Sequence, residues 1–156
     1  LIIASLALAI ISCAGSDDST NTSGSTDSTA TAESLSGSGV FIVAGLSGNI
    51  LISTNKGSSF DNATSPTSNN LYGVGFGNNT FVAVGDNGTI VRSTDNGTTW
   101  DNVTSPTSNF LIGVGFGYNT FVAAGTYGNI LRSTDNGSSW DNATSPIQNQ
   151  LRGVGF

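Results

Sequence analysis

A period of forty residues runs through residues 40–156 and constrains the fold more than any other feature of the sequence. FIVAG at 41–45 returns as FVAVG at 81–85 and as FVAAG at 121–125. Segments 71–110 and 111–150 are identical at 27 of their 40 positions. Repeats of this length build architectures in which one supersecondary unit stacks on the next, so a single unit predicts the fold of all.

Each unit has the pattern of four short β-strands separated by tight turns. Its turns carry Asn-Gly or Asp-Asn-Gly, whose residues accept the positive φ of tight hairpins. Four strands in forty residues predict an all-β fold, a β-propeller with about three four-stranded blades over residues 40–156. Propellers usually close with 4–8 blades, so we expect an incomplete ring, a fragment. The strands predicted in the second unit are 71–76, 80–84, 89–94 and 98–103.

The two ends of the repeat region are irregular. Residues 31–36 read TAESLS where the first unit needs its first strand, so that unit is either degenerate or completed by another segment. Residues 151–156 read LRGVGF, which matches LYGVGF at 71 and LIGVGF at 111. We expect them to form the opening strand of a fourth unit.

A second motif recurs in phase with the repeat. STDNGTTW begins at Ser93 and STDNGSSW at Ser133, and both fit the pattern S-x-D-x-G-x-[ST]-W. The pattern resembles the Asp-box (BNR-like) repeats of β-propellers, most closely those of photosystem II assembly or stability factors. In the first unit Asn55 replaces Asp, and Phe60 replaces Trp and is expected to keep its packing without the indole N–H. The residues that carry the resemblance are Ser93, Asp95, Gly97, Trp100, Ser133, Asp135, Gly137 and Trp140.

The box has a structural explanation that needs no ligand. Asp95 and Asp135 are expected to accept hydrogen bonds from their own turns, while the following glycines take a positive φ. Trp100 and Trp140 recur at the blade period, which favours core residues over sugar-stacking platforms. We predict no metal site, because calcium loops need several converging carboxylates and each turn offers one.

The composition excludes several classes of function. The chain has no His, so it has no Ser-His-Asp or Cys-His apparatus. The chain has only four basic residues and ten acidic ones, which excludes the basic surface that nucleic-acid binding normally requires. Glycosidases need catalytic carboxylic acids, and the repeats contain no Glu, while their Asp residues lie at turn positions. We therefore predict no enzyme activity, no catalytic residue and no cofactor.

Arg92 and Arg132 hold the same position in successive units. The resemblance to photosystem assembly factors implies that these arginines contribute to a basic, partner-binding patch. The alternative is a charge on the strand rim, paired with Asp86, Asp95 or Asp135.

Residues 1–12 are predicted to be part of a lipoprotein signal peptide. The apolar run at 1–11 is shorter than the roughly 20 residues of a membrane span, but suits a secretory signal. It ends in Ile-Ser-Cys, which resembles the lipobox of bacterial lipoproteins and implies lipidation of Cys13. The alternative is an accidental thiol in an ordinary signal peptide. Residues 13–39, rich in Ser, Thr and Gly, are predicted to form a disordered tether.

The expected function is non-catalytic binding or scaffolding by a propeller that a lipid anchor holds on a membrane of the bacterial cell envelope. The partner would be a protein or a glycan. Two alternatives stay open: a sialidase-like glycoside hydrolase with catalytic residues outside this segment, and a chaperone similar to photosystem II assembly factors. Differences between the second and third units suit variable loops on a scaffold, and fall mostly in turns, at 72/112, 78/118, 86–87/126–127 and 107–108/147–148.

Overall fold

The computed structural model describes residues 39–156. The predicted signal peptide at 1–12, Cys13 and the tether up to residue 38 lie outside the described residues. Within 39–156, no helix has both the length and the apolar character needed to cross a membrane.

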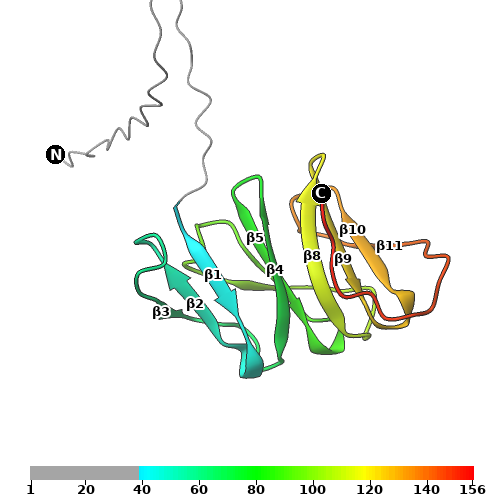
Figure 1. The fold of residues 1–156 in the computed structure, drawn as a ribbon, viewed down its shortest axis with the longest axis horizontal. Helices are drawn as coiled ribbons and strands as arrows, with labels where there is room; N and C mark the ends of the chain where they lie inside the picture. The colour runs from blue at the N-terminus through cyan, green and yellow to red at the C-terminus, as the bar shows by residue number, and fades with distance from the viewer. Residues whose placement is uncertain (1–38) are drawn as a thin grey trace, which may run out of the picture. The chain divides into compact units, whose positions relative to one another are not determined.

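The described residues form three antiparallel sheets, which we call blades 1, 2 and 3. In each blade the strands pair in chain order, so every blade is an up-and-down meander, and the blades follow one another side by side (Figure 1). This arrangement confirms the all-β propeller prediction. The strands of blade 1 are β1 (Phe41–Ala44), β2 (Ile50–Ser53) and β3 (Asp61–Ala63). Those of blade 2 are β4 (Leu71–Gly77), β5 (Thr80–Gly85), β6 (Ile90–Ser93) and β7 (Asp101–Val103). Those of blade 3 are β8 (Leu111–Gly117), β9 (Thr120–Gly125), β10 (Ile130–Ser133) and β11 (Asp141–Ala143).

The fourth strand of blade 2 is shorter than the sequence pattern predicts. In blade 2 it begins at Asp101 rather than at residue 98. The difference arises because Thr99 and Trp100 are hydrogen-bonded to the turn that precedes the strand, and this leaves them no place in the ladder.

Turns with positive φ connect the strands. Single 3₁₀ turns join the second and third strands of blades 2 and 3, η2 (Asp86–Gly88) and η3 (Thr126–Gly128), and in blade 1 η1 (Leu46–Gly48) joins β1 and β2. In the middle of η2 and η3, Asn87 and Tyr127 have φ of 54° and 57°. Asn tolerates this left-handed region well, whereas a bulky ring there is uncommon. Tyr127 is therefore a departure from the repeat that folding does not explain.

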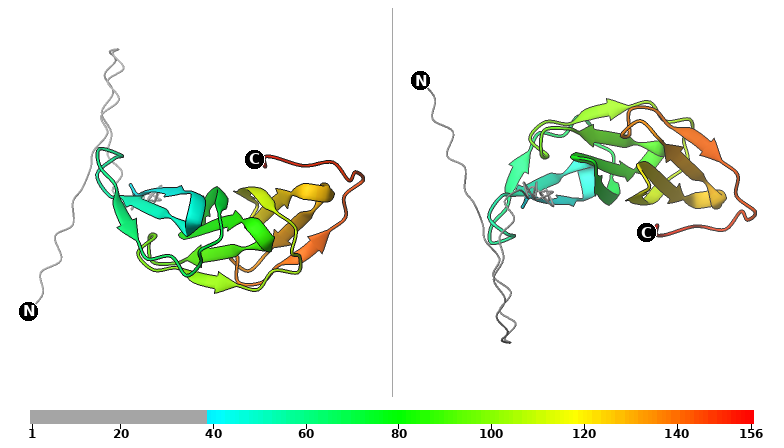
Figure 2. Two further views of the ribbon diagram at one scale, coloured as in Figure 1. Left: turned by 90° about the horizontal axis from the view of Figure 1, so that it is seen from below. Right: turned by 90° about the horizontal axis from the view of Figure 1, so that it is seen from above.

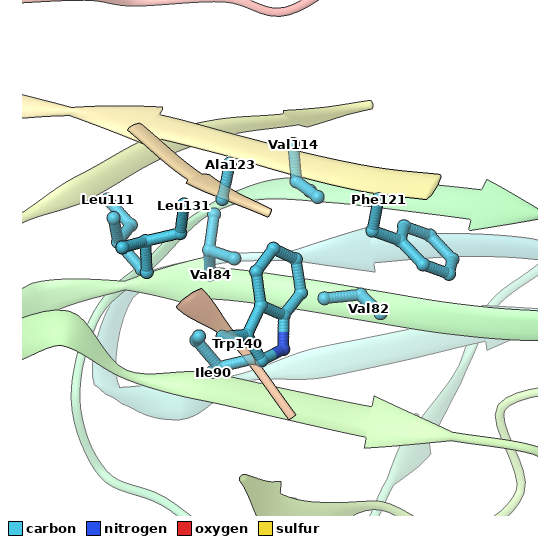
Figure 3. Packing of buried hydrophobic residues seen from close by; sticks show 9 residues of the cluster. All are labelled: Val82, Val84, Ile90, Leu111, Val114, Phe121, Ala123, Leu131 and Trp140. Atoms are coloured by element: carbon cyan, nitrogen blue, oxygen red, sulfur yellow. The ribbon is translucent and has the colours of Figure 1, made fainter. Parts of the chain in front are cut away.

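The hydrophobic core lies between blades. One cluster of buried residues joins blades 2 and 3 and includes Val82, Val84 and Trp140 (Figure 3). A second cluster joins blades 1 and 2 and includes Ile50, Phe81 and Trp100. Each tryptophan therefore belongs to the cluster that its blade shares with the preceding blade.

Phe60 corrects an expectation drawn from the repeat. The sequence pattern predicts that Phe60 keeps the packing of the tryptophans, yet it is 40% exposed while Trp100 and Trp140 are 6% exposed. Blade 1 is the first blade among the described residues, so the cluster that would cover Phe60 has no preceding blade to build it.

The first strands of neighbouring blades approach closely, and glycines permit it. A Cβ on Gly73 of β4 would lie 2.7 Å from the carbonyl oxygen of Ile112 on β8. Glycine within a strand is typical of such close backbone approach. The views of Figure 2, together with the many contacts between β4 and β8, place these strands side by side.

Residues 151–156 continue this arrangement. The Leu151 amide donates to the Gly125 carbonyl at 2.9 Å, as the Leu71 amide donates to the Gly45 carbonyl at 3.0 Å. A Cβ on Gly113 would lie 2.9 Å from the Cα of Gly153. The segment thus follows β8 as β8 follows β4, although it has no strand partner within the described part of the chain.

Candidate functional site

The antiparallel strands place the turns of every blade on two opposite faces. We call one the connector face; it carries η1, η2, η3 and the links between blades at 64–70, 104–110 and 144–150. We call the other the Asp-box face; it carries the hairpins at 77–80 and 117–120 and the turns at 53–60, 93–100 and 133–140. Each first strand runs from the connector face, where Leu71 pairs with Gly85, to the Asp-box face, where Gly77 pairs with Thr80.

On the Asp-box face, hydrogen bonds within the turn occupy both carboxylate oxygens of Asp95. Its Oδ1 accepts from the Ser93 hydroxyl at 2.8 Å and from the Thr99 amide at 2.9 Å, and its Oδ2 accepts from the Thr99 hydroxyl at 2.6 Å. The Gly97 amide donates to Ser93 Oγ at 2.9 Å, and Gly97 has φ of 82°. The same bonds recur in blade 3 among Ser133, Asp135, Gly137 and Ser139.

These bonds lower the pKa of both carboxyl groups. The pKa of Asp135 falls to about 2, chiefly because the hydroxyl and then the amide of Ser139 donate to the ionised form. The pKa of Asp95 is lowered mainly by the same two groups of Thr99. Within residues 39–156, no three Asp, Glu, Cys or His side chains gather closely enough to hold a metal ion. The carboxylates thus hold the turn together.

Blade 1 builds the same turn without a charge. Asn55 Oδ1 accepts from the Ser53 hydroxyl at 2.9 Å and from the Ser59 amide at 3.0 Å. The one difference is a reversed bond, in which Asn55 Nδ2 donates to Ser59 Oγ at 2.8 Å. Asparagine has nearly the shape of aspartate, so the turn needs the side-chain geometry more than the charge.

The two tryptophans pack against the core side of the Asp-box turns. Trp100 Nε1 donates to the Gly97 carbonyl at 3.0 Å, and Trp140 Nε1 donates to the Gly137 carbonyl at 3.2 Å. Their ring centroids lie 6.4 and 6.5 Å from those of Phe81 and Phe121. Both rings are buried, so neither offers a flat surface to a sugar.

Arg92 reaches from its own blade to the next. Its Nε donates to the Asn136 carbonyl at 2.6 Å, in the Asp-box turn of blade 3. It also lines a cleft of about 500 Å³ together with Asp101, Ser139 and Trp140. Arg132 has the equivalent place in blade 3 and is exposed. The hydrogen bond gives Arg92 a structural role between blades, and partner binding by either arginine stays a prediction.

Exposed aromatic side chains mark the connector face. Tyr72 and Phe110 are each 45% exposed and line a cleft of about 300 Å³ with Ile112, Gln150 and Arg152. Phe110 also lines an adjoining cleft of about 210 Å³ with Ser108, Asn109, Thr126 and Tyr127. The neighbouring Asp86 carboxylate raises the pKa of the Tyr72 phenol, mainly through a hydrogen bond. The connector face therefore combines apolar rings with charges of both signs.

Differences between blades 2 and 3 concentrate on this face. Tyr72, Asn87 and Phe110 of blade 2 correspond to Ile112, Tyr127 and Gln150 of blade 3. On the Asp-box face, Asn78 becomes Tyr118, and the remaining changes exchange Thr for Ser at 98/138 and 99/139. The connector-face positions that change in character are 72/112, 86/126, 87/127, 89/129, 107/147, 108/148 and 110/150.

The sequence analysis did not single out Tyr72, Phe110 or Tyr127 as site residues. The sequence does contain a feature that could have identified them, because each of these residues differs from its counterpart forty residues away. Sequence alone did not show that these positions share one face. It singled out Arg92 and the Asp-box residues, and the structure places all of these away from the connector-face clefts.

Comparison with known proteins supports the propeller architecture. No protein-family model matches the sequence, and no curated protein matches it. A solved structure described as YCF48 bound to D1 peptide has a TM-score of 0.60 and 17% identity, covering 69% of this chain and 36% of that one. YCF48 from Cyanidioschyzon merolae has a TM-score of 0.56 and 20% identity, covering 67% and 33%. This chain spans about a third of the length of the structures it matches. At these identities the similarity establishes a shared fold.

Proposed function

We propose that this chain is a non-catalytic binding protein that holds an extended protein segment on its connector face. One observation carries the proposal: the side chains that break the repeat gather on that face, around two adjoining clefts that share Phe110. Repeated positions maintain the fold, whereas a binding site needs different side chains in neighbouring blades. Loops presented by a rigid scaffold commonly carry binding function.

The chemistry of the clefts favours a peptide over a glycan. Tyr and Arg are enriched among the residues that dominate protein interfaces, and Tyr72, Tyr127 and Arg152 lie at these clefts. The rings offer apolar surface, while the Arg152 guanidinium suits a carboxylate. The D1 peptide bound to YCF48 supports this choice by analogy of fold. It also supports the more specific alternative, an assembly chaperone similar to YCF48.

A selection experiment tests the binding face. The full chain is used to select binders from a displayed library of random peptides, and affinities are measured by fluorescence anisotropy. We expect Phe110→Ala to weaken the selected peptides by about tenfold or more, as for a central interface residue. Asn78→Ala, on the Asp-box face, is the matched control and should leave affinity unchanged. Peptides that respond to Asn78→Ala but not to Phe110→Ala would overturn the proposal.

The same assay separates the alternatives. A D1 peptide that competes for the connector face would favour the assembly chaperone. Oligosaccharides that compete while no peptide is selected would favour a glycan-binding protein and contradict the peptide proposal. The absence of catalysis is supported by Asp95 and Asp135, whose carboxylate oxygens already accept hydrogen bonds from their own turns.

The second part of the proposal concerns anchoring. Cys13 follows the apolar run at 1–11 and precedes a segment rich in Ser, Thr and Gly, which suits a lipidated residue on a tether in the bacterial envelope. Metabolic labelling with a clickable palmitate in a bacterial host tests it. We expect the chain to be labelled and Cys13→Ala to abolish the label. Equal labelling of the two would show that Cys13 is not the anchor.

A further inference from the structure

The turns of blades 2 and 3 contain three Asn-Gly pairs, at Asn87-Gly88, Asn96-Gly97 and Asn136-Gly137. An asparagine followed by glycine is chemically labile, because glycine has no side chain to keep its amide nitrogen away from the asparagine side chain. The flanking residues are nearly the same in all three pairs, and the asparagines have φ of 54°, 61° and 60°. Sequence and backbone conformation therefore do not distinguish the pairs.

Hydrogen bonds hold the two pairs on the Asp-box face. The Gly97 amide donates to Ser93 Oγ at 2.9 Å, and the Gly137 amide donates to Ser133 Oγ at 2.9 Å. Asn136 is held on both of its oxygens. Its Oδ1 accepts from Asn78 Nδ2 at 2.9 Å, and its carbonyl accepts from Arg92 Nε at 2.6 Å. The Asp-box turn thus engages the glycine amide that would attack the asparagine.

The pair on the connector face is not held in this way. Asn87 is exposed in the middle of η2, and within residues 39–156 neither its side chain nor the Gly88 amide makes a hydrogen bond. In η3 the equivalent amide, that of Gly128, donates to the Asn149 carbonyl at 2.8 Å. All three glycines of the Asn-Gly pairs are buried, so burial does not separate them and hydrogen bonding does.

We propose that Asn87 is a site of spontaneous deamidation. The Gly88 amide nitrogen loses its proton to water and forms a bond to Cγ of Asn87, while the bond from Cγ to the side-chain nitrogen breaks and ammonia leaves. Water then opens the cyclic imide. Opening at one carbonyl gives aspartate, and opening at the other gives isoaspartate. The reaction needs only water, because no atom is oxidised or reduced.

The modification changes both the charge and the main-chain length of η2. Either product places a second carboxylate beside Asp86, and isoaspartate adds a methylene to the main chain. The turn has little room for it, because a Cβ on Gly88 would collide with the Thr107 carbonyl of the link at 104–110. The equivalent turns of blades 1 and 3 have Ser47 and Tyr127 in place of the asparagine. The reaction therefore distinguishes blade 2 from its neighbours on the connector face.

Mass spectrometry of the full chain tests the site. Trypsin cleaves after Lys56, Arg92, Arg132 and Arg152, and so places the three pairs in separate peptides, 57–92, 93–132 and 133–152. The folded chain is incubated at mildly alkaline pH in water enriched in heavy oxygen and is then digested in ordinary water, so that only deamidation before digestion carries the label. We expect label at Asn87 to accumulate at least about fivefold faster than at Asn96 or Asn136, a factor that one hydrogen bond can supply. Equal rates at the three sites would overturn the proposal.

Tyr127→Asn supplies a matched control in the same molecule. It places an Asn-Gly pair in η3, where φ is 57° against 54° at Asn87, but where the glycine amide is hydrogen-bonded. We expect position 127 to deamidate more slowly than Asn87 in this variant. In guanidinium chloride the hydrogen bonds are lost, so the native pairs should react at similar rates. A rate at position 127 equal to that of Asn87, or a preference for Asn87 that persists in the unfolded chain, would also overturn the proposal.

Discussion

The two faces of the blades differ in how their polar side chains are arranged. On the Asp-box face, Ser93, Asp95 and Thr99 satisfy one another, and Trp100 seals the turn from the core side. On the connector face, aromatic rings and the Arg152 side chain line open clefts. The Asp-box turns are occupied by their own hydrogen bonds, whereas the connector-face clefts are open.

The pattern of variation follows this difference. The Asp-box turns of blades 2 and 3 differ only by exchange of Thr and Ser, and Ser and Thr both supply the hydroxyl that donates to the aspartate. The connector face has Tyr72 in one blade and Ile112 in the next, although the backbone around them is the same. Exposed positions that change in character between units of one backbone are not fixed by the fold that the units share.

The largest expected effect concerns the Asp-box face. Trp140→Ala removes a buried ring from the cluster between blades 2 and 3 and should lower the free energy of unfolding by about 3–5 kcal/mol in urea titrations. Tyr118→Ala is the control, because that ring is 89% exposed on the same face and should change stability by less than about 0.5 kcal/mol. Similar losses in the two variants would remove the distinction between core and surface rings.

Asp135→Ala should have the next largest effect. It leaves the Ser139 amide and hydroxyl without their acceptors, and we expect a loss of about 1–2 kcal/mol in the same titration. Asp135→Asn should recover most of that loss at neutral pH, because Asn55 forms the same turn in blade 1. If Asn were as destabilising as Ala, charge rather than geometry would hold the box.

Acid should weaken the boxes that carry a carboxylate. The folded-state pKa of Asp135 is about 2, below its ordinary value of 3.8, so the folded state favours the ionised form. The stability that this group contributes is present above pH 3.8 and is lost as the pH falls toward 2. Unfolding free energies measured between pH 6 and pH 2 should fall less in the Asp95→Asn, Asp135→Asn double variant than in the unsubstituted chain. If the free energy of unfolding fell as much with pH in the double variant as in the unsubstituted chain, this assignment would be contradicted.

The smallest effect belongs to the connector face. Tyr127 has φ of 57° and is 75% exposed, while its counterpart Asn87 has nearly the same φ. Tyr127→Asn should leave thermal stability unchanged or raise it slightly, within about 1 kcal/mol, because Asn adopts this conformation more readily. A clear loss of stability would show that the ring has a folding role.

The sequence predicted the blades, the hairpins and the Asp-box turns, because these depend on interactions within forty residues. The hydrogen bonds of Asp95 and the positive φ of Gly97 are local, so one unit contains all the residues that form them. The short fourth strand was missed because the same local bonds hold Thr99 and Trp100 back from the ladder.

Contacts between blades were harder to predict. The repeat showed that Arg92 recurs in successive units, but it could not identify the hydrogen-bond partner of Arg92. That partner is the backbone carbonyl of Asn136, forty-four residues away. Phe60 matches the tryptophans in sequence, yet its burial depends on a neighbouring blade. The clefts of the connector face join residues of different units, such as Phe110 and Arg152, and no single unit contains them.

The proposed function requires that the connector face binds a partner and contributes little to the stability of the fold. Its most direct test makes the two units alike on that face by giving blade 3 and its link the side chains of blade 2. The changes are Ile112→Tyr, Thr126→Asp, Tyr127→Asn, Asn129→Thr, Ile147→Thr, Gln148→Ser and Gln150→Phe. We expect the free energy of unfolding of this variant to lie within about 1 kcal/mol of that of the unsubstituted chain, because these positions are on the surface. We expect the selected peptides to bind it at least about tenfold more weakly. A variant that loses stability but keeps its affinity for the peptides would contradict this proposal. So would a variant that keeps both its stability and its affinity.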